Sequence, residues 1–218
     1  MGKWLEQCVL RSCGVVAHHR FLFPRDMLFE RLRMCIGKAP KAESNPWTPD
    51  RLCWTVSTVL DRLKNSADFR PIMDHLLPIA GADPVGSQSW LQLVLKITRL
   101  FDNYLWYRHE WILNWESGGS LGAEEPVNQW QPKLWRAVCQ EVRHQHPDSL
   151  HFPRLLQLAR GEHSCTFPPL YLFGVTRLPP SLLSALAELS RASLATADVT
   201  DSGGGGGGGP VGGDDNND

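Results

Sequence analysis

The chain has 218 residues and a formal net charge of −1, so its overall charge neither indicates nor excludes a nucleic-acid partner. Hydrophobic residues make up 42 %, enough for a buried core, and no apolar run reaches the roughly 18 residues of a membrane-spanning helix. Nine tryptophans predict large packing or stacking surfaces. The six cysteines contain no C-x-x-C pair, which predicts reduced thiols in a cytoplasmic protein rather than disulfides or a zinc site.

The first 37 residues predict the start of an α/β unit. Apolar residues at helical spacing predict a helix over residues 2–12. Two apolar runs, 14–17 and 21–23, predict a short buried strand and its exit. Pro24 favours a helix start, and we expect that helix over residues 25–36, followed by Gly37 as its stop.

The middle of the chain is predicted to be helical. Thr48-Pro49-Asp50 is typical of a helix start, with a capping hydroxyl, a proline in the first turn and a carboxylate near the helix N-terminus. Shorter periodic runs predict further helices, which we expect over residues 69–77, 130–145 and 152–160. The longest run, 91–116, predicts one amphipathic helix of about seven turns.

One residue interrupts the apolar face of that long helix. Arg108 lies where a leucine would be expected, and a buried guanidinium needs a carboxylate, a phosphate or a set of carbonyls. A structural ion pair with Asp102 or Glu116 is one interpretation, and an anionic ligand is the other. Asp102 and Trp106 lie one turn apart, so the helix should present an acceptor and a flat ring side by side.

The pattern changes after residue 165. Residues 170–175 form a continuous apolar run of strand type, followed by Leu178-Pro179-Pro180 and another periodic helix. The fold class is therefore expected to be α/β but predominantly helical, with a helical subdomain inserted between two distant strands. We expect the first part of the α/β domain at 1–37, the insertion at 38–165, the return strand and helix at 166–191, and a disordered Gly/Asp tail at 192–218.

No motif in the chain predicts catalysis. The chain contains neither a G-x-x-x-x-G-K-[ST] phosphate loop nor a G-x-S-x-G nucleophile turn. His18-His19 and His144-x-His146 lack partners at ligand spacing and are expected to be solvated. We therefore predict no metal, no cofactor and no catalytic centre in this chain.

Several stretches together resemble one family, the gamma subunit of exodeoxyribonuclease V (RecC). The longest is the family's F-D-x-Y-L-x-Y-R-x-x-W-x-x-x-W-E run, which the chain reproduces from Phe101 to Glu116. A W-Q-x-x-L-W run begins at Trp130, an L-F-G…L-P-P turn spans 172–180, and Trp4-Leu5 resembles an early W-L helix. Order and spacing agree over roughly residues 1–191.

The resemblance implies a non-catalytic subunit of an ATP-dependent helicase/exonuclease that processes broken DNA ends. It implies part of a superfamily 1 helicase-like domain with an inserted helical subdomain, which guides single-stranded DNA and scans it for the Chi sequence. The implied partners are single- and double-stranded DNA and RecB-like and RecD-like subunits, which would use ATP and Mg²⁺. The implied strand-scanning residues are Lys3, Phe23, Phe29, Leu100, Asp102 and Arg108.

The chain departs from the family pattern in places. Lys3, Phe23 and Arg99 stand where the resemblance leads us to expect an amide, a leucine and an acidic residue. The family's opening strand and most of its longer chain are missing, so a truncated gene fragment is one expectation. A protein–protein docking module, with tryptophans that bind partner subunits, is the alternative function, and an autonomous enzyme is a third.

Overall fold

The computed structural model describes residues 2–15, 22–38, 45–76, 85–160, 170–173 and 178–201, and all regular structure in these ranges is helical. The longer helices are α1 (Gly2–Cys13), α2 (Pro24–Cys35), α3 (Pro49–Leu63), α5 (Gln88–Tyr107), α6 (His109–Glu116), α7 (Trp130–Gln145), α8 (Phe152–Ala159) and α9 (Pro180–Asp201). Short elements are η1 (Ala67–Phe69), α4 (Arg70–Met73), η2 (Asp74–Leu76) and η3 (Pro126–Asn128).

The expected strands are not found in the described part of the chain. Gly14–Val15, residues 22–23 and Leu170–Phe173 have no strand assignment, and residues 16–21 and 174–175 lie outside the described ranges. The predominantly helical prediction is confirmed, whereas its α/β component has no support from these residues. None of the described helices is both long and apolar enough to cross a membrane.

Helices α2 and α3 begin at the prolines that predicted their starts. Pro24 and Pro49 each occupy the first turn, where the fixed φ of proline suits a helix and its missing N–H costs no hydrogen bond. The predicted hydroxyl cap at Thr48 is wrong, because its Oγ1 donates to the Asn45 carbonyl at 3.1 Å instead. Ser87 does cap α5, accepting the Trp90 N–H at 3.1 Å.

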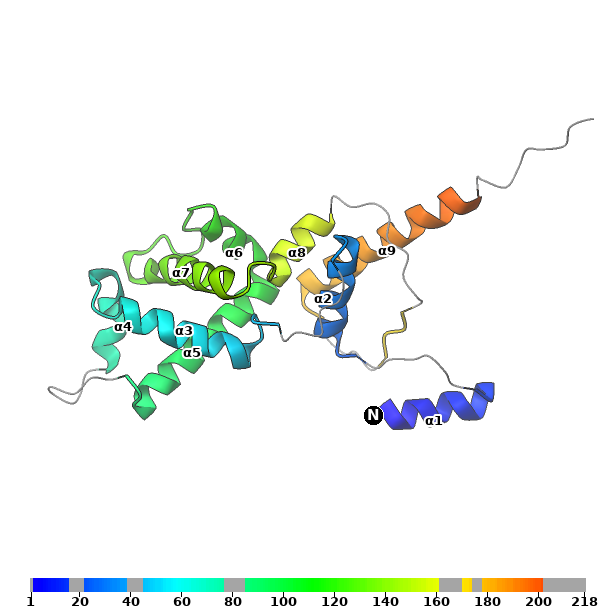
Figure 1. Cartoon of the computed structure of the whole chain (residues 1–218), viewed down its shortest axis with the longest axis horizontal. Helices are drawn as coiled ribbons and strands as arrows, with labels where there is room; N and C mark the ends of the chain where they lie inside the picture. The colour runs from blue at the N-terminus through cyan, green and yellow to red at the C-terminus, as the bar shows by residue number, and fades with distance from the viewer. Residues whose placement is uncertain are drawn as a thin grey trace, which may run out of the picture.

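The helices form two groups that share α5 (Figure 1). In the first, α3 packs against α5 and α7, and α7 packs against α6. In the second, α2 packs against α8 and α9 beside the C-terminal half of α5. A continuous set of buried side chains runs through both groups, from Met27 to Leu189. By contrast, α1 lies apart and buries none of its residues.

The single long helix expected over residues 91–116 is wrong. It breaks at Arg108, whose φ of −136° and ψ of 45° are not helical, and α6 begins at the next residue. The break turns α6 toward α7, which allows Ile112 and Trp115 to become fully buried. Packing of these two side chains therefore prevails over an otherwise continuous helical pattern.

The last helix is longer than expected. Its backbone continues to Asp201, through the first ten residues of the predicted disordered tail. Residues 202–218, which carry the glycine run, lie outside the described ranges.

Candidate nucleic-acid interface

An ion pair joins the first turn of α2 to the C-terminal half of α5. Arg25 Nη1 donates to both carboxylate oxygens of Asp102, at 3.0 and 3.2 Å. The Asp102 side chain is 15 % exposed and that of Arg25 is 42 % exposed. The ion pair expected between Asp102 and Arg108 is therefore wrong, because Asp102 is already occupied by a residue from another helix.

The ring of Trp106 lies beside the same guanidinium. Arg25 Cζ is 4.6 Å from the centroid of the Trp106 ring, within the range of a cation–π contact. Asp102 and Trp106 thus present a carboxylate and an aromatic face to one cation, which confirms the prediction that they lie side by side. Sequence reasoning missed Arg25 itself, because no motif distinguishes it from other arginines that follow a helix-starting proline.

Aromatic packing and one hydrogen bond tie Trp106 to three further helices. Phe152 of α8 stacks on its ring with centroids 4.2 Å apart, and Phe29 of α2 approaches it edge-on at 6.3 Å. At the start of α9, the buried Ser181 hydroxyl donates to the Trp106 carbonyl, one of the last carbonyls of α5. We call Arg25, Asp102, Trp106, Phe152 and Ser181 the four-helix junction, since they join α2, α5, α8 and α9.

Arg108 is exposed rather than buried in an apolar stripe. The helix break at this residue turns its side chain outward, where its guanidinium lies 5.4 Å from the Trp111 ring centroid. Burial raises the pKa of the nearby Tyr104 hydroxyl, and the charge of Arg108 partly offsets that rise. Neither of its predicted carboxylate partners binds it, because Asp102 pairs with Arg25 and Glu116 with His151.

The other predicted DNA-binding residues have contrasting environments. Phe23 is 79 % exposed at the start of α2, two residues before Arg25. Phe29 and Leu100 are half-buried and pack against the core. Lys3 is exposed on α1, away from the other helices. The structure therefore brings Phe29 and Asp102 to the four-helix junction and Phe23 next to it in the chain, but not Lys3 or Arg108.

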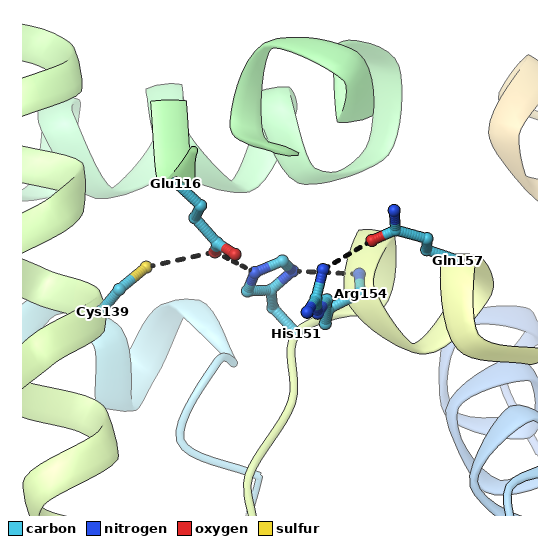
Figure 2. Close-up of polar contacts among 5 residues, drawn as sticks. All are labelled: Glu116, Cys139, His151, Arg154 and Gln157. Carbon is cyan, nitrogen blue, oxygen red and sulfur yellow. Dashed lines mark hydrogen bonds and ion pairs between the residues drawn. The ribbon is translucent and has the colours of Figure 1, made fainter. Parts of the chain in front are cut away.

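A second polar cluster lies between α6, α7 and the start of α8 (Figure 2). His151 Nε2 contacts Glu116 Oε1, and Cys139 Sγ lies 3.5 Å from the same oxygen. The buried His151 ring packs against the rings of Trp47 and Trp135, at centroid distances of 5.1 and 5.8 Å. A cavity of about 280 Å³ adjoins the cluster and is also lined by Arg143, Ser149, Leu150 and Arg154.

The hydrogen bonds of His151 define its tautomer. Nδ1 accepts the Arg154 backbone N–H at 3.3 Å, as the N-cap of α8, so Nδ1 carries no proton. Nε2 therefore carries the proton and donates a hydrogen bond to the Glu116 carboxylate. Burial opposes ionisation of Glu116, but the hydrogen bonds from His151 and Cys139, together with the positive charge of Arg143, outweigh it and lower the Glu116 pKa.

Glu116, Cys139 and His151 satisfy one another's hydrogen bonds within this cluster. Burial and the neighbouring Glu116 charge raise the pKa of Cys139 well above its usual value, so its thiol is not an activated nucleophile. Atoms of Glu116, Cys139 and His151 that could ligate a metal lie within 4.8 Å of one another. However, the proton on Nε2 and the bond accepted by Nδ1 occupy both ring nitrogens that a metal could use.

Comparison with known proteins identifies relatives over most of the chain. Residues 1–195 match the family model described as RecC, N-terminal domain. The chain is 26 % identical over 198 residues to RecBCD enzyme subunit RecC of Escherichia coli, covering 88 % of the chain and 17 % of that relative. RecBCD enzyme subunit RecC of Haemophilus influenzae is 27 % identical, and the match covers 87 % of the chain and 19 % of that relative. The same subunit of Mycolicibacterium smegmatis is 28 % identical, and the match covers 85 % of the chain and 16 % of that relative. The chain thus spans less than a fifth of the length of each.

Proposed function

Because the chain belongs to the RecC N-terminal domain family, we propose that it serves in a RecBCD-type complex that processes broken DNA ends. In this role it guides single-stranded DNA and takes part in scanning for Chi during recombinational repair. The observation that carries the proposal is the family match over residues 1–195, since the relatives are named as RecC subunits of the RecBCD enzyme.

The proposal gives the chain no chemistry of its own. Its RecB-like and RecD-like partners would bind ATP and Mg²⁺ and carry out unwinding and cleavage in the cytoplasm. The helices between residues 38 and 165 would then be the inserted subdomain of a superfamily 1 helicase-like domain. The inactive thiol and the mutually satisfied Glu116–His151 pair are compatible with a subunit that binds rather than reacts.

Exposed aromatic and cationic side chains support a single-stranded ligand. Phe23 and Tyr107 expose 79 % and 54 % of their surface, and the Arg25 and Arg108 guanidinium groups lie on tryptophan rings. Unpaired bases stack on exposed rings, while arginines hydrogen-bond phosphates and base edges. Rings and cations of this kind are common to proteins that bind single strands.

A docking module is the second candidate function. Trp54 on α3 is 72 % exposed and Trp4 on α1 is 58 % exposed, on helices that do not contribute to the four-helix junction. Large exposed tryptophans are typical of protein interfaces. Under this alternative, partner subunits would cover these rings, and substitution of Arg25 or Arg108 would leave assembly unchanged.

A binding measurement separates the two candidates. Fluorescence anisotropy of a labelled single-stranded oligonucleotide should report binding by the full chain at about 50 mM salt, weakening steeply as salt rises because phosphate contacts release counterions. An equal concentration of unlabelled duplex should compete less well. Absence of binding at low salt would contradict the DNA role and leave the docking function.

A further inference from the structure

We propose that Arg25 is the residue of the four-helix junction that contacts single-stranded DNA, and that Asp102 and Trp106 position it. The inference rests on the proposed DNA function and goes beyond it, because Arg25 is absent from the residues that the family resemblance implies. It also changes the role of Asp102, from a direct DNA contact to the residue that orients a cation.

The carboxylate of Asp102 is poorly placed to meet DNA by itself. Its side chain is only 15 % exposed, and both of its oxygens accept from Arg25. An unpaired carboxylate would also repel a phosphate backbone, whereas the positive charge of Arg25 offsets that repulsion when the two side chains are paired. Asp102 is therefore placed to act through Arg25.

Arg25 keeps donors available while it is held in place. A guanidinium has five N–H donors, and only Nη1 is engaged by Asp102. Nη2 and Nε have no hydrogen-bond partner within the described ranges, and the side chain is 42 % exposed. The Trp106 ring, 4.6 Å from Cζ, supports the flat face of the group. Two fixed contacts thus orient the remaining edge of a planar fork, which suits a ligand with two adjacent acceptors.

Single-stranded DNA supplies such acceptor pairs in two places. The O6 and N7 atoms of guanine form one pair, and two phosphate oxygens form the other. Phe23, two residues before Arg25 and 79 % exposed, offers a ring on which a neighbouring base can stack. An arginine fork beside an exposed phenyl ring is therefore suited to one nucleotide of an unpaired strand.

The test compares variants of the full chain by anisotropy at about 50 mM salt. Arg25→Ala should weaken binding about five-fold to a hundred-fold, the range for loss of one bidentate arginine contact. Arg51→Ala is the matched control, since Arg51 is likewise an arginine in the first turn of a helix started by proline, and it is exposed. It should bind like the wild type. Arg25→Lys, which keeps the charge but loses the fork, should retain the fold and still bind less tightly.

A double-mutant cycle distinguishes positioning from direct contact. Asp102→Asn should weaken binding in the wild-type background, but change it by less than about two-fold when Arg25 is already alanine. The loss of affinity caused by Arg25→Ala is also compared on a thymidine homopolymer and on a guanine-containing strand, which distinguishes a phosphate contact from a guanine contact. Equal losses on both strands indicate a phosphate contact, and a larger loss with guanine indicates a base contact.

The outcomes keep the two proposals separate. If the wild-type chain binds no single strand, the proposed DNA function fails. If it binds, and both Arg25 variants match Arg51→Ala while their thermal unfolding is normal, the role of Arg25 is overturned and the DNA function stands. If Asp102→Asn weakens binding equally with and without Arg25, Asp102 contacts DNA itself and the positioning role is overturned.

Discussion

The Phe152 ring stacks on the Trp106 ring with centroids 4.2 Å apart and planes inclined by 24°. This contact joins the last turn of α5 to the first turn of α8, and both side chains are buried. Phe152 thus packs on the ring that Arg25 contacts, so the stability of the core and the geometry of the candidate interface depend on the same pair.

Replacing Phe152 with alanine should destabilise the chain by about 3–5 kcal/mol, the usual cost of removing a buried aromatic ring. Urea unfolding followed by circular dichroism would measure the change. Trp54→Ala is the control, because Trp54 is 72 % exposed and its loss should cost little. Equal effects of the two substitutions would mean that the stack is not part of the core.

The Glu116–His151 pair predicts a specific dependence of stability on pH. The pKa of Glu116 in the folded chain is below its ordinary 4.5, so its ionised form stabilises the fold. That contribution is fully present above pH 4.5 and is lost as the pH falls through the lowered folded-state value. Glu116→Gln should therefore cost about 1.5–3 kcal/mol at neutral pH, as expected for a hydrogen bond to a charged group.

Unfolding curves for Glu116→Gln between neutral pH and acid pH would check this. The difference from the wild type should shrink as the pH falls below 4.5, because the wild-type carboxylate becomes protonated. Glu110, an exposed carboxylate on the same helix, provides the control variant Glu110→Gln, which should leave the acid limb unchanged. A difference that grows toward low pH would contradict the assignment.

Cysteine labelling tests the environment of Cys139. Cys139 is buried and its pKa is raised well above the usual value by burial and by Glu116, whereas Cys13 is exposed. Because only the thiolate alkylates readily, iodoacetamide near pH 8 should modify Cys13 and spare Cys139 in the folded chain. Mass spectrometry of the peptides would read this out. Modification of Cys139 at the rate of Cys13 would place it in a different environment.

Gly122 determines how closely its loop approaches the Trp111 ring. Its φ is +75°, and a Cβ at this position would lie 2.4 Å from the ring. Gly122→Ala should therefore displace Trp111, the ring on which Arg108 lies, in addition to straining the backbone. Gly118, with φ of +96° and open space around it, makes Gly118→Ala a control for strain alone. Gly122→Ala should be the more destabilising variant in thermal unfolding.

Local sequence signals predicted most helices, and non-local contacts account for the main errors. Pro24, Pro49 and the periodic run at 130–145 located α2, α3 and α7 closely. The single helix predicted over residues 91–116 is wrong at Arg108, because the apolar period continues through this residue while the helical backbone does not. The break depends on the burial of Ile112 and Trp115 against α7, which no pattern within residues 91–116 reveals.

The candidate interface was only partly predicted, again because some of its contacts are non-local. The spacing of Asp102 and Trp106 on one helix placed them together, but the cation that joins them comes from 77 residues earlier in the chain. Likewise, Glu116 and His151 come from different helices, and neither belongs to a recognisable ligand motif. Pairings of this kind depend on how the helices pack, so they become visible only in the folded chain.

Photo-crosslinking to a single-stranded oligonucleotide, followed by peptide mapping, tests most directly whether the four-helix junction binds DNA. We expect crosslinks concentrated at the start of α2, around Phe23 and Arg25, and reduced by the substitution Arg25→Ala but not by Arg51→Ala. Crosslinks confined to α3 around Trp54, or unaffected by either substitution, would contradict it.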